Sequence, residues 1–141
     1  MASRDLEDLH PLVADKAKQL VELAAAEGIE ILVTSTLRTF EEQADLFAIG
    51  RTKPGNKVTN AKPGESWHNF GLAFDVVPLV NGKAIFDSPF WNRIGELGKQ
   101  VGLSWGGDFK SFKDKPYFEF HPDLTLAEAN QRRENNQNML A

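Results

Sequence analysis

The sequence contains no cysteine, and this absence excludes several kinds of chemistry. Without thiols there can be no disulfide bond, no zinc site built from thiolates and no thiol nucleophile. The sequence also lacks any apolar run close to the roughly 20 residues that a membrane-spanning helix needs. We therefore expect no membrane partner, and a chain that is compatible with a reducing cytoplasm.

An excess of positive charge is missing as well. The formal net charge is −4 and the isoelectric point is near 5.4, which argues against a nucleic-acid partner. Hydrophobic residues make up 41% of the 141 residues and charged residues 26%, as in ordinary soluble globular proteins. We expect a monomer with one domain over residues 1–141, whose core spans about residues 8–134.

The elements that are present follow clear local signals. Apolar residues at three- and four-residue spacing predict a helix from Pro11 to about Ala26. Two capping boxes, which begin at Thr39 and Thr125, predict two more helices. The remaining patterns predict a helix from Ser88-Pro89 to about Gly102, strands at residues 29–35, 72–80, 83–86, around 105 and at 117–121, and a tight turn at Asn81-Gly82.

The segment from Ser66 to Asp75 carries the first candidate site. His68 and Asp75 lie seven residues apart, so a straight strand would point them to opposite faces. They can converge only if the backbone turns or bulges between them, and Gly71 is the residue that permits this. Histidine and aspartate are both suitable zinc ligands.

Two other segments are candidates for binding. Arg38 lies where a predicted strand ends and a helix begins, and its planar fork suits a carboxylate, although a surface ion pair would also explain it. Residues 51–65 form a long loop with two Pro-Gly pairs and four basic residues. Long loops inside compact domains are usually functional or mobile. Such a loop would suit an anionic polymer substrate, and a merely solvated loop is the alternative.

Together these blocks resemble a known family. The segment Ser66–Asp75 matches the pattern S-x-H-x-x-G-x-A-x-D of zinc peptidases of the VanY/LAS type, peptidase family M15. Its endopeptidase branch, found in phage endolysins, is the nearest in pattern. Further blocks similar to that branch extend the resemblance over roughly residues 8–121: Arg38–Gln43, Gly50–Gly55, Val58–Ala61 and Trp105–Asp114.

The resemblance implies an α+β fold of the LAS/hedgehog type, with helices on one side of a small antiparallel sheet and a zinc cleft on the other. It implies Zn²⁺ as cofactor, with His68 and Asp75 as ligands. It also implies that Asp114 is the general base and that Arg38 binds substrate and stabilises the tetrahedral intermediate. Such a site is chemically coherent. We further expect substrate-binding roles for Ser66 and for Gln43, which could support Arg38 from its helix.

One position departs from the family pattern. The endopeptidase pattern ends in Asp-x-Pro-His-Phe, whose histidine is the third zinc ligand, whereas this chain has Tyr117 there. Three readings follow. His121 or Glu119 completes a rearranged metal shell; or Tyr117 weakens the site and leaves a binding protein of low activity; or Tyr117 is itself the ligand. A phenol, with an ordinary pKa near 10, is a poor ligand at neutral pH.

The leading functional hypothesis from the resemblance is a zinc-dependent peptidoglycan endopeptidase of the phage endolysin type. It would cleave the L-alanyl-D-glutamate bond of the stem peptide. The N-terminal sequence lacks the apolar core of a signal peptide. We therefore expect synthesis in the host cytoplasm and action on the cell wall or periplasm after holin-type release. The alternatives are a D,D-carboxypeptidase and a weakly active or inactive peptidoglycan-binding relative.

Overall fold

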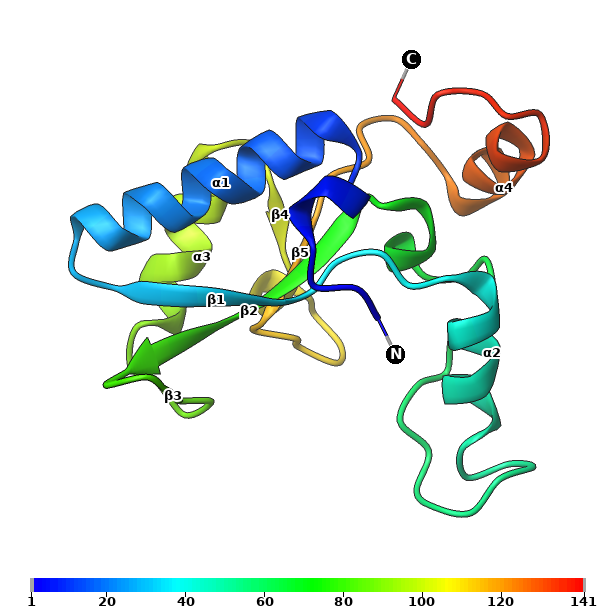
Figure 1. Ribbon diagram of the computed structural model, residues 1–141, viewed down its shortest axis with the longest axis horizontal. Coiled ribbons are helices and arrows are strands. Elements are labelled where there is room, and N and C mark those ends of the chain that lie inside the picture. Colours follow the sequence, from blue (N-terminus) through cyan, green and yellow to red (C-terminus); the bar gives the residue numbers. More distant parts are fainter. Residues whose placement is uncertain (1, 141) are drawn as a thin grey trace.

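A computed structural model describes residues 2–140 of the chain (Figure 1). Its helices and strands are interspersed along the sequence, and short 3-10 turns lie between some of them. The helices and strands are α1 (Pro11–Ala26), β1 (Glu30–Ser35), α2 (Phe40–Ala48), β2 (Ala73–Val80), β3 (Lys83–Ala84), α3 (Trp91–Gln100), β4 (Ser104–Trp105), β5 (Tyr117–Glu119) and α4 (Leu126–Glu134).

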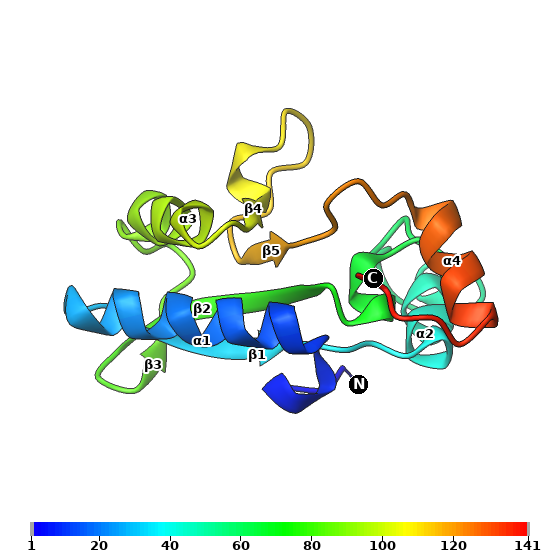
Figure 2. The same cartoon turned by 90° about the horizontal axis from the view of Figure 1, so that it is seen from above.

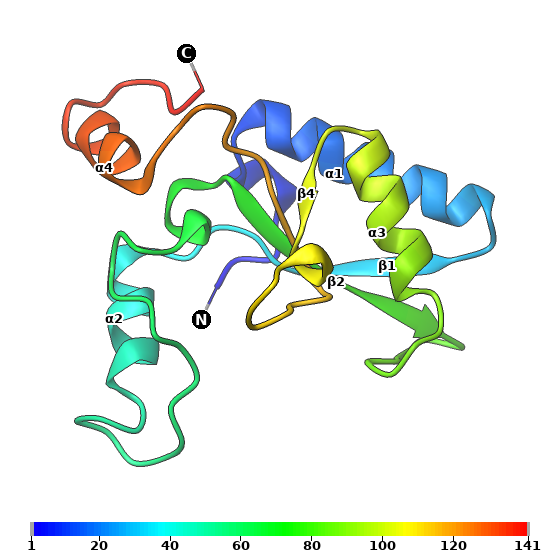
Figure 3. The same cartoon turned by 180° about the vertical axis from the view of Figure 1, so that it is seen from behind.

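The strands form one antiparallel sheet in the order β1-β2-β5-β4, and β3 pairs with β2 as a hairpin. Figure 2 shows α1 running along β1 and β2, and α1 packs against α3 on the same face of the sheet. Helices α2 and α4 lie together at one end of the molecule (Figure 3). The predicted α+β class with a small antiparallel sheet is confirmed.

Helix α1 has the bounds that the sequence predicts. Its buried stripe repeats every three or four residues, and His10 caps its first turn by accepting a hydrogen bond from the Leu12 backbone. Leu12 itself is 49% exposed, since it lies beside the stripe rather than within it. The buried residues of the stripe are Val13, Ala14, Ala17, Leu20 and Ala24.

Alternation along β2 and β5 divides the sheet into a core face and a cleft face. On the core face, Phe74 and Phe118 are fully buried and stack with their ring centroids 5.7 Å apart. Their neighbours Asp75 and Tyr117 point to the opposite face, and these two residues are directly paired across the strands. The polar side chains of the candidate site therefore lie on the side of the sheet away from α1 and α3.

Helix α3 approaches the sheet closely because it carries glycine where it crosses the core. A Cβ atom added at Gly95 would overlap the ring of Trp105, and one at Gly98 would overlap the ring of Phe118. The helix begins at Trp91 rather than at Ser88-Pro89 as predicted. The Ser88 hydroxyl instead accepts a hydrogen bond from the Phe90 backbone in the turn that precedes the helix.

The hairpin and both capping boxes are confirmed. Asn81 and Gly82 both have positive φ, 52° and 77°, as a two-residue hairpin turn requires. Thr39 and Thr125 each accept a hydrogen bond from the backbone of the third residue of their helix, a glutamate. The side chain of that glutamate accepts one from the backbone N–H of the threonine. Strand β5 ends at Glu119, however, so His121 lies beyond it and not within a strand. Within residues 2–140, no helix has the length and apolar character to cross a membrane.

Candidate active site

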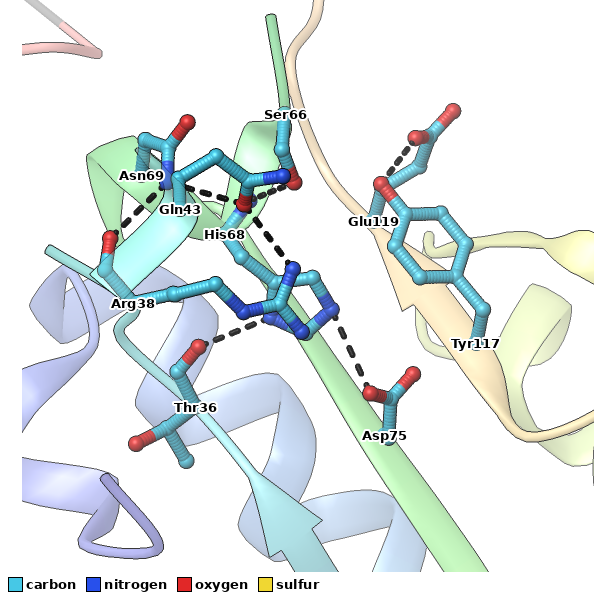
Figure 4. A network of polar contacts seen from close by, with 9 residues as sticks. All are labelled: Thr36, Arg38, Gln43, Ser66, His68, Asn69, Asp75, Tyr117 and Glu119. Atoms are coloured by element: carbon cyan, nitrogen blue, oxygen red, sulfur yellow. Dashed lines mark hydrogen bonds and ion pairs between the residues drawn. The ribbon is translucent and has the colours of Figure 1, made fainter. Parts of the chain in front are cut away.

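A cleft of about 560 Å³ opens on the polar face of the sheet. Its floor comes from β2 and β5, and its walls come from α2, the loop before the Ser66–Asp75 segment, and the loop after β4. It collects most of the residues that the sequence singles out, shown in part in Figure 4. Among its lining residues are Arg38, Ser66, His68, Asp75, Asp114, Tyr117 and Glu119.

The backbone turn that the sequence requires between His68 and Asp75 occurs at Gly71. Ser66 caps a short 3-10 helix, Trp67–Phe70, by accepting a hydrogen bond from the His68 backbone. Gly71 then adopts the left-handed conformation with φ 70°. A side chain there would crowd the backbone near Asp8, at 3.2 Å, so glycine is needed for both reasons. The chain then enters β2.

His68 and Asp75 converge. Nε2 of His68 lies 3.3 Å from Oδ2 of Asp75, and Nδ1 of His68 lies 2.8 Å from the backbone carbonyl of Thr36. A carbonyl only accepts hydrogen bonds, so Nδ1 carries a proton, and Nε2 is the ring atom that faces the carboxylate. Either a proton on Nε2 or a metal ion can lie between Nε2 and Oδ2. Two ligands about 2 Å from one zinc ion in a tetrahedral site are about 3.3 Å apart, which fits this pair.

Hydrogen bonds from neighbouring residues fix the position of Arg38 in the cleft. Its Nη1 donates to Oε1 of Gln43 at 3.0 Å, and Nε2 of Gln43 donates to the carbonyl of Ala61 at 2.8 Å. Asn69 donates to the carbonyl of Arg38 at 2.9 Å. Gln43 is fully buried and does not line the cleft, which corrects the expectation that it contacts substrate. It positions Arg38, whereas Ser66 does line the cleft.

Asp114 stands at the end of the loop over residues 106–114, here called the rim loop. Its backbone N–H donates to the Gly106 carbonyl at 3.0 Å, and Nε1 of Trp105 donates to the Lys115 carbonyl at 2.7 Å. The two ends of the rim loop are thus joined. Partial burial, and then the negative charge of Asp75, raise the pKa of Asp114, while His68 opposes the rise. A carboxyl with a raised pKa is suited to exchange protons with substrate.

Tyr117 completes the group around His68. It lies directly opposite Asp75 in the β2–β5 ladder, and its ring centroid is 5.5 Å from that of His68. Its hydroxyl donates to Oε2 of Glu119 at 2.6 Å. Burial, and then the charge and hydrogen bond of Glu119, raise the pKa of Tyr117 far above its usual range. In this environment the phenol donates a hydrogen bond to Glu119.

His121 is not brought to the cleft. Its Nε2 forms an ion pair with Oε1 of Glu119 at 3.0 Å, and its ring stacks on Trp67 with centroids 3.8 Å apart. It lines a separate cavity of about 190 Å³ together with Phe120 and Pro122. Burial alone would lower the pKa of His121, but the hydrogen bond and charge of Glu119 raise it overall.

The residues present fit a metal ion at two positions and not at a third. His68 and Asp75 have the spacing of two ligands of one ion. Among residues 2–140, however, no three His, Cys, Asp or Glu side chains are grouped so that they could share a metal. The third side of the site holds the protonated phenol of Tyr117. The donor set is therefore one ligand short of the three that a catalytic zinc site usually takes from the protein.

Some residues of the site carry no signal in the sequence. The Thr36 carbonyl orients His68, but a backbone acceptor cannot be recognised from residue type. Asn69 holds Arg38 from a variable position of the Ser66–Asp75 pattern. Phe112 lines the cleft and is 89% exposed with φ 54°, an unusual combination for an aromatic residue. The basic loop over residues 51–65 can be recognised from its composition, whereas nothing in the sequence marks Phe112 as a residue of the cleft.

The α+β fold and a cleft with an arginine, a free carboxylate and a histidine–carboxylate pair define a small hydrolase. A model of the VanY family, described as D-alanyl-D-alanine carboxypeptidase, matches residues 6–113. The chain belongs to this family and is a peptidase, as the sequence resemblance predicts. The matched segment ends just before Asp114, so the departure at Tyr117 lies outside it.

Three relatives illustrate the relationship. The chain is 42% identical over 126 residues to the peptidoglycan L-alanyl-D-glutamate endopeptidase CwlK of Bacillus subtilis, which covers 82% of this chain and 75% of that protein. It is 29% identical over 126 residues to the L-alanyl-D-glutamate peptidase of Listeria phage A118; the match covers 84% of this chain but only 41% of the phage protein. A solved vancomycin resistance D,D-pentapeptidase VanY in complex with Zn(II) has the same fold, with a TM-score of 0.61 at 15% identity over 93% of this chain and 81% of that one.

Proposed function

We propose that this chain is a peptidoglycan endopeptidase that hydrolyses the L-alanyl-D-glutamate bond of the stem peptide. The observation that carries the proposal is the 42% identity with CwlK over most of both chains. The cleft supports it, because it is open, lined by both polar and apolar residues, and flanked by a basic loop. A peptide with free carboxylates would fit such a surface.

Two side chains of the cleft have geometry suited to the reaction. Arg38 is fixed by Gln43 and presents its guanidinium to the cleft, where it can bind a substrate carboxylate and the oxyanion that forms at the scissile carbonyl. Asp114 can take a proton from the attacking water and return it to the departing amine of D-glutamate. The water oxygen becomes part of the new L-alanine carboxylate, and the C–N bond breaks.

We further propose Zn²⁺ as the metal of this chain, with His68 and Asp75 as its holders. The 3.3 Å spacing of Nε2 and Oδ2 supports these two positions, and the VanY structure contains Zn(II). His121, by contrast, does not line the cleft, and its ring nitrogen is paired with Glu119. The third position lacks a ligand. The roles proposed for Arg38 and Asp114 therefore rest on the geometry of these two side chains and not on the metal.

The test is digestion of purified peptidoglycan with added zinc, followed by mass spectrometry of the products. Cleavage should create new N-terminal D-glutamate, and Asp114→Asn should abolish it while the variant stays folded. Intact stem peptides at saturating metal would contradict the proposal and would indicate a peptidoglycan-binding protein.

A D,D-carboxypeptidase is the second candidate, because the matching family model carries that description. The two activities act at opposite ends of the stem peptide. The carboxypeptidase would release free D-alanine from a pentapeptide stem and leave L-alanine joined to D-glutamate. The same digest therefore separates them without another assay.

We propose cell-wall degradation during phage lysis as the setting, with the chain acting as a monomer. The relationship to the Listeria phage A118 peptidase supports this setting. Expression in the bacterial cytoplasm should lyse cells only when a membrane-permeabilising protein is expressed with it. Lysis by the chain alone would contradict release through a holin, and a dimer in sedimentation would contradict the monomer.

A further inference from the structure

Tyr117, Glu119 and His121, here called the tyrosine cluster, are joined to one another rather than to the His68–Asp75 pair. The Tyr117 hydroxyl donates to one oxygen of Glu119 at 2.6 Å. The other oxygen of Glu119 pairs with His121 at 3.0 Å. Both oxygens of the carboxylate are therefore engaged.

The direction of the Tyr117 side chain is equally informative. Its backbone lies opposite Asp75, so a side chain at this position can reach the space beside His68. A tyrosine is longer than a histidine, and its oxygen lies past that space. Figure 4 shows the hydroxyl pointing toward Glu119 and away from the His68–Asp75 pair. The ring fills the third side of the site without presenting a donor atom to it.

The far end of the cluster is fixed as well. The ring of His121 stacks almost parallel on Trp67, at an interplanar angle of 7° and 3.8 Å between centroids. Trp67 also contacts Phe70, which is buried in the core. Turning the Tyr117 hydroxyl toward the His68–Asp75 pair would thus break a short hydrogen bond. Turning the His121 ring toward that pair would break an ion pair and an aromatic stack.

We propose that this chain holds its metal through only two of its own side chains, His68 and Asp75, and that the tyrosine cluster closes the third ligand position. The inference rests on the proposed function for the expectation that a metal belongs in this cleft. A two-ligand site leaves the remaining coordination positions to water or substrate. The metal is then weakly held and exchangeable, and activity follows the concentration of free zinc.

The first test is a zinc titration of metal-stripped full-length protein against a competing chelator. The parent chain should bind zinc weakly, and Tyr117→Phe, which removes only the hydroxyl, should change the Kd by less than about threefold. Tyr117→His should tighten binding on the order of 100-fold, since even partners of ligands are worth 10- to 100-fold in affinity. His121→Gln should leave the Kd unchanged, whereas His68→Ala should abolish binding in every background.

A second readout uses the fact that Tyr117 is the only tyrosine of the chain. If zinc binding deprotonated a tyrosine, the ultraviolet difference spectrum would show a phenolate band, and that band could come only from Tyr117. We expect none. With cobalt in place of zinc, the parent should give the weak visible bands of a water-rich site, and Tyr117→His the intense bands of a tetrahedral one.

The outcomes separate the alternatives. A phenolate band, or a loss of zinc affinity in Tyr117→Phe, would overturn the proposal and make Tyr117 a ligand. A loss of affinity in His121→Gln would overturn it in favour of His121. Tight zinc binding by the parent, equal to that of Tyr117→His, would also overturn it. None of these measurements needs substrate, whereas failure of the proposed function would appear as metal-loaded Tyr117→His that leaves stem peptides intact.

Discussion

Arg38 and Gln43 are joined by a 3.0 Å hydrogen bond, and the Gln43 side chain is fully buried. It is the only buried residue of helix α2, a position where an apolar residue would be expected. Its amide is satisfied at both ends, by Arg38 and by the Ala61 carbonyl. A buried amide of this kind sets the direction of the guanidinium and links α2 to the basic loop.

Replacing Gln43 by leucine should therefore affect catalysis as well as stability. The variant leaves the Ala61 carbonyl unpaired, which should cost about 1–3 kcal/mol of unfolding free energy. Loss of Arg38 alignment should lower kcat/KM by up to about 100-fold. Denaturant unfolding and kinetics on a stem-peptide substrate measure the two effects. Glu41→Ala, an exposed change in the same helix, should alter neither, and an unchanged kcat/KM in Gln43→Leu would show that Arg38 needs no support.

Replacing Arg38 by lysine should lower the activity. A lysine keeps the charge but loses the planar fork and the bond to Gln43, so it cannot bind a carboxylate through two parallel hydrogen bonds. We expect kcat/KM of Arg38→Lys to fall on the order of 100-fold or more. Arg51→Lys in the basic loop, where the guanidinium packs on Phe47, is the matched control and should retain most activity. Equal losses in both variants would show that the position of Arg38 in the cleft has no special role.

The carboxyl of Asp114 should titrate above the ordinary aspartate range in metal-free protein. Burial, and then the charge of Asp75, make its ionisation harder and so raise its pKa. As pH falls, Asp114 should therefore take up its proton at a higher pH than the ordinary aspartate value near 3.9 would give. The measurement is a carboxyl-carbon NMR titration of the metal-free protein, in which Asp114→Asn identifies the resonance. Asp108→Asn, an exposed change in the rim loop, should leave this titration in place, and a midpoint near 3.9 would show that the cleft does not perturb Asp114.

Gly98→Ala should destabilise the fold although alanine is the better helix former. The added methyl group would overlap the ring of Phe118, whose neighbour in β5 is Tyr117. Overpacking of this kind should cost about 1–3 kcal/mol, more than the gain in helix propensity. Gln100→Ala, exposed on the same helix, should stay within about 0.5 kcal/mol of the parent. Thermal unfolding of both variants tests this, and a more stable Gly98→Ala would show that α3 can move away from the sheet.

Local signals in the sequence predict the helices, the hairpin and the turn at Gly71 well, because each depends on neighbouring residues. The sequence also predicts that His68 and Asp75 converge, because the turn that brings them together occurs at Gly71, which lies between them. The place of His121 does not, because it depends on where β5 ends and on a stack with the distant Trp67. The burial of Gln43 is likewise set by Ala61 and Asn69, which approach it only in the folded chain.

The joined ends of the rim loop have a consequence for how this protein can diversify. Gly106 and Asp114 are held together through their backbones, and a side chain at Gly106 would overlap the Asp114 carbonyl. The segment between them, with the exposed Phe112 at the cleft, is thereby uncoupled from the position of the carboxylate. Insertions or exchanges there can reshape what the cleft accepts while Asp114 keeps its place. The loop is therefore a point at which the shape of the cleft can change while the His68–Asp75 pair and Asp114 stay in place.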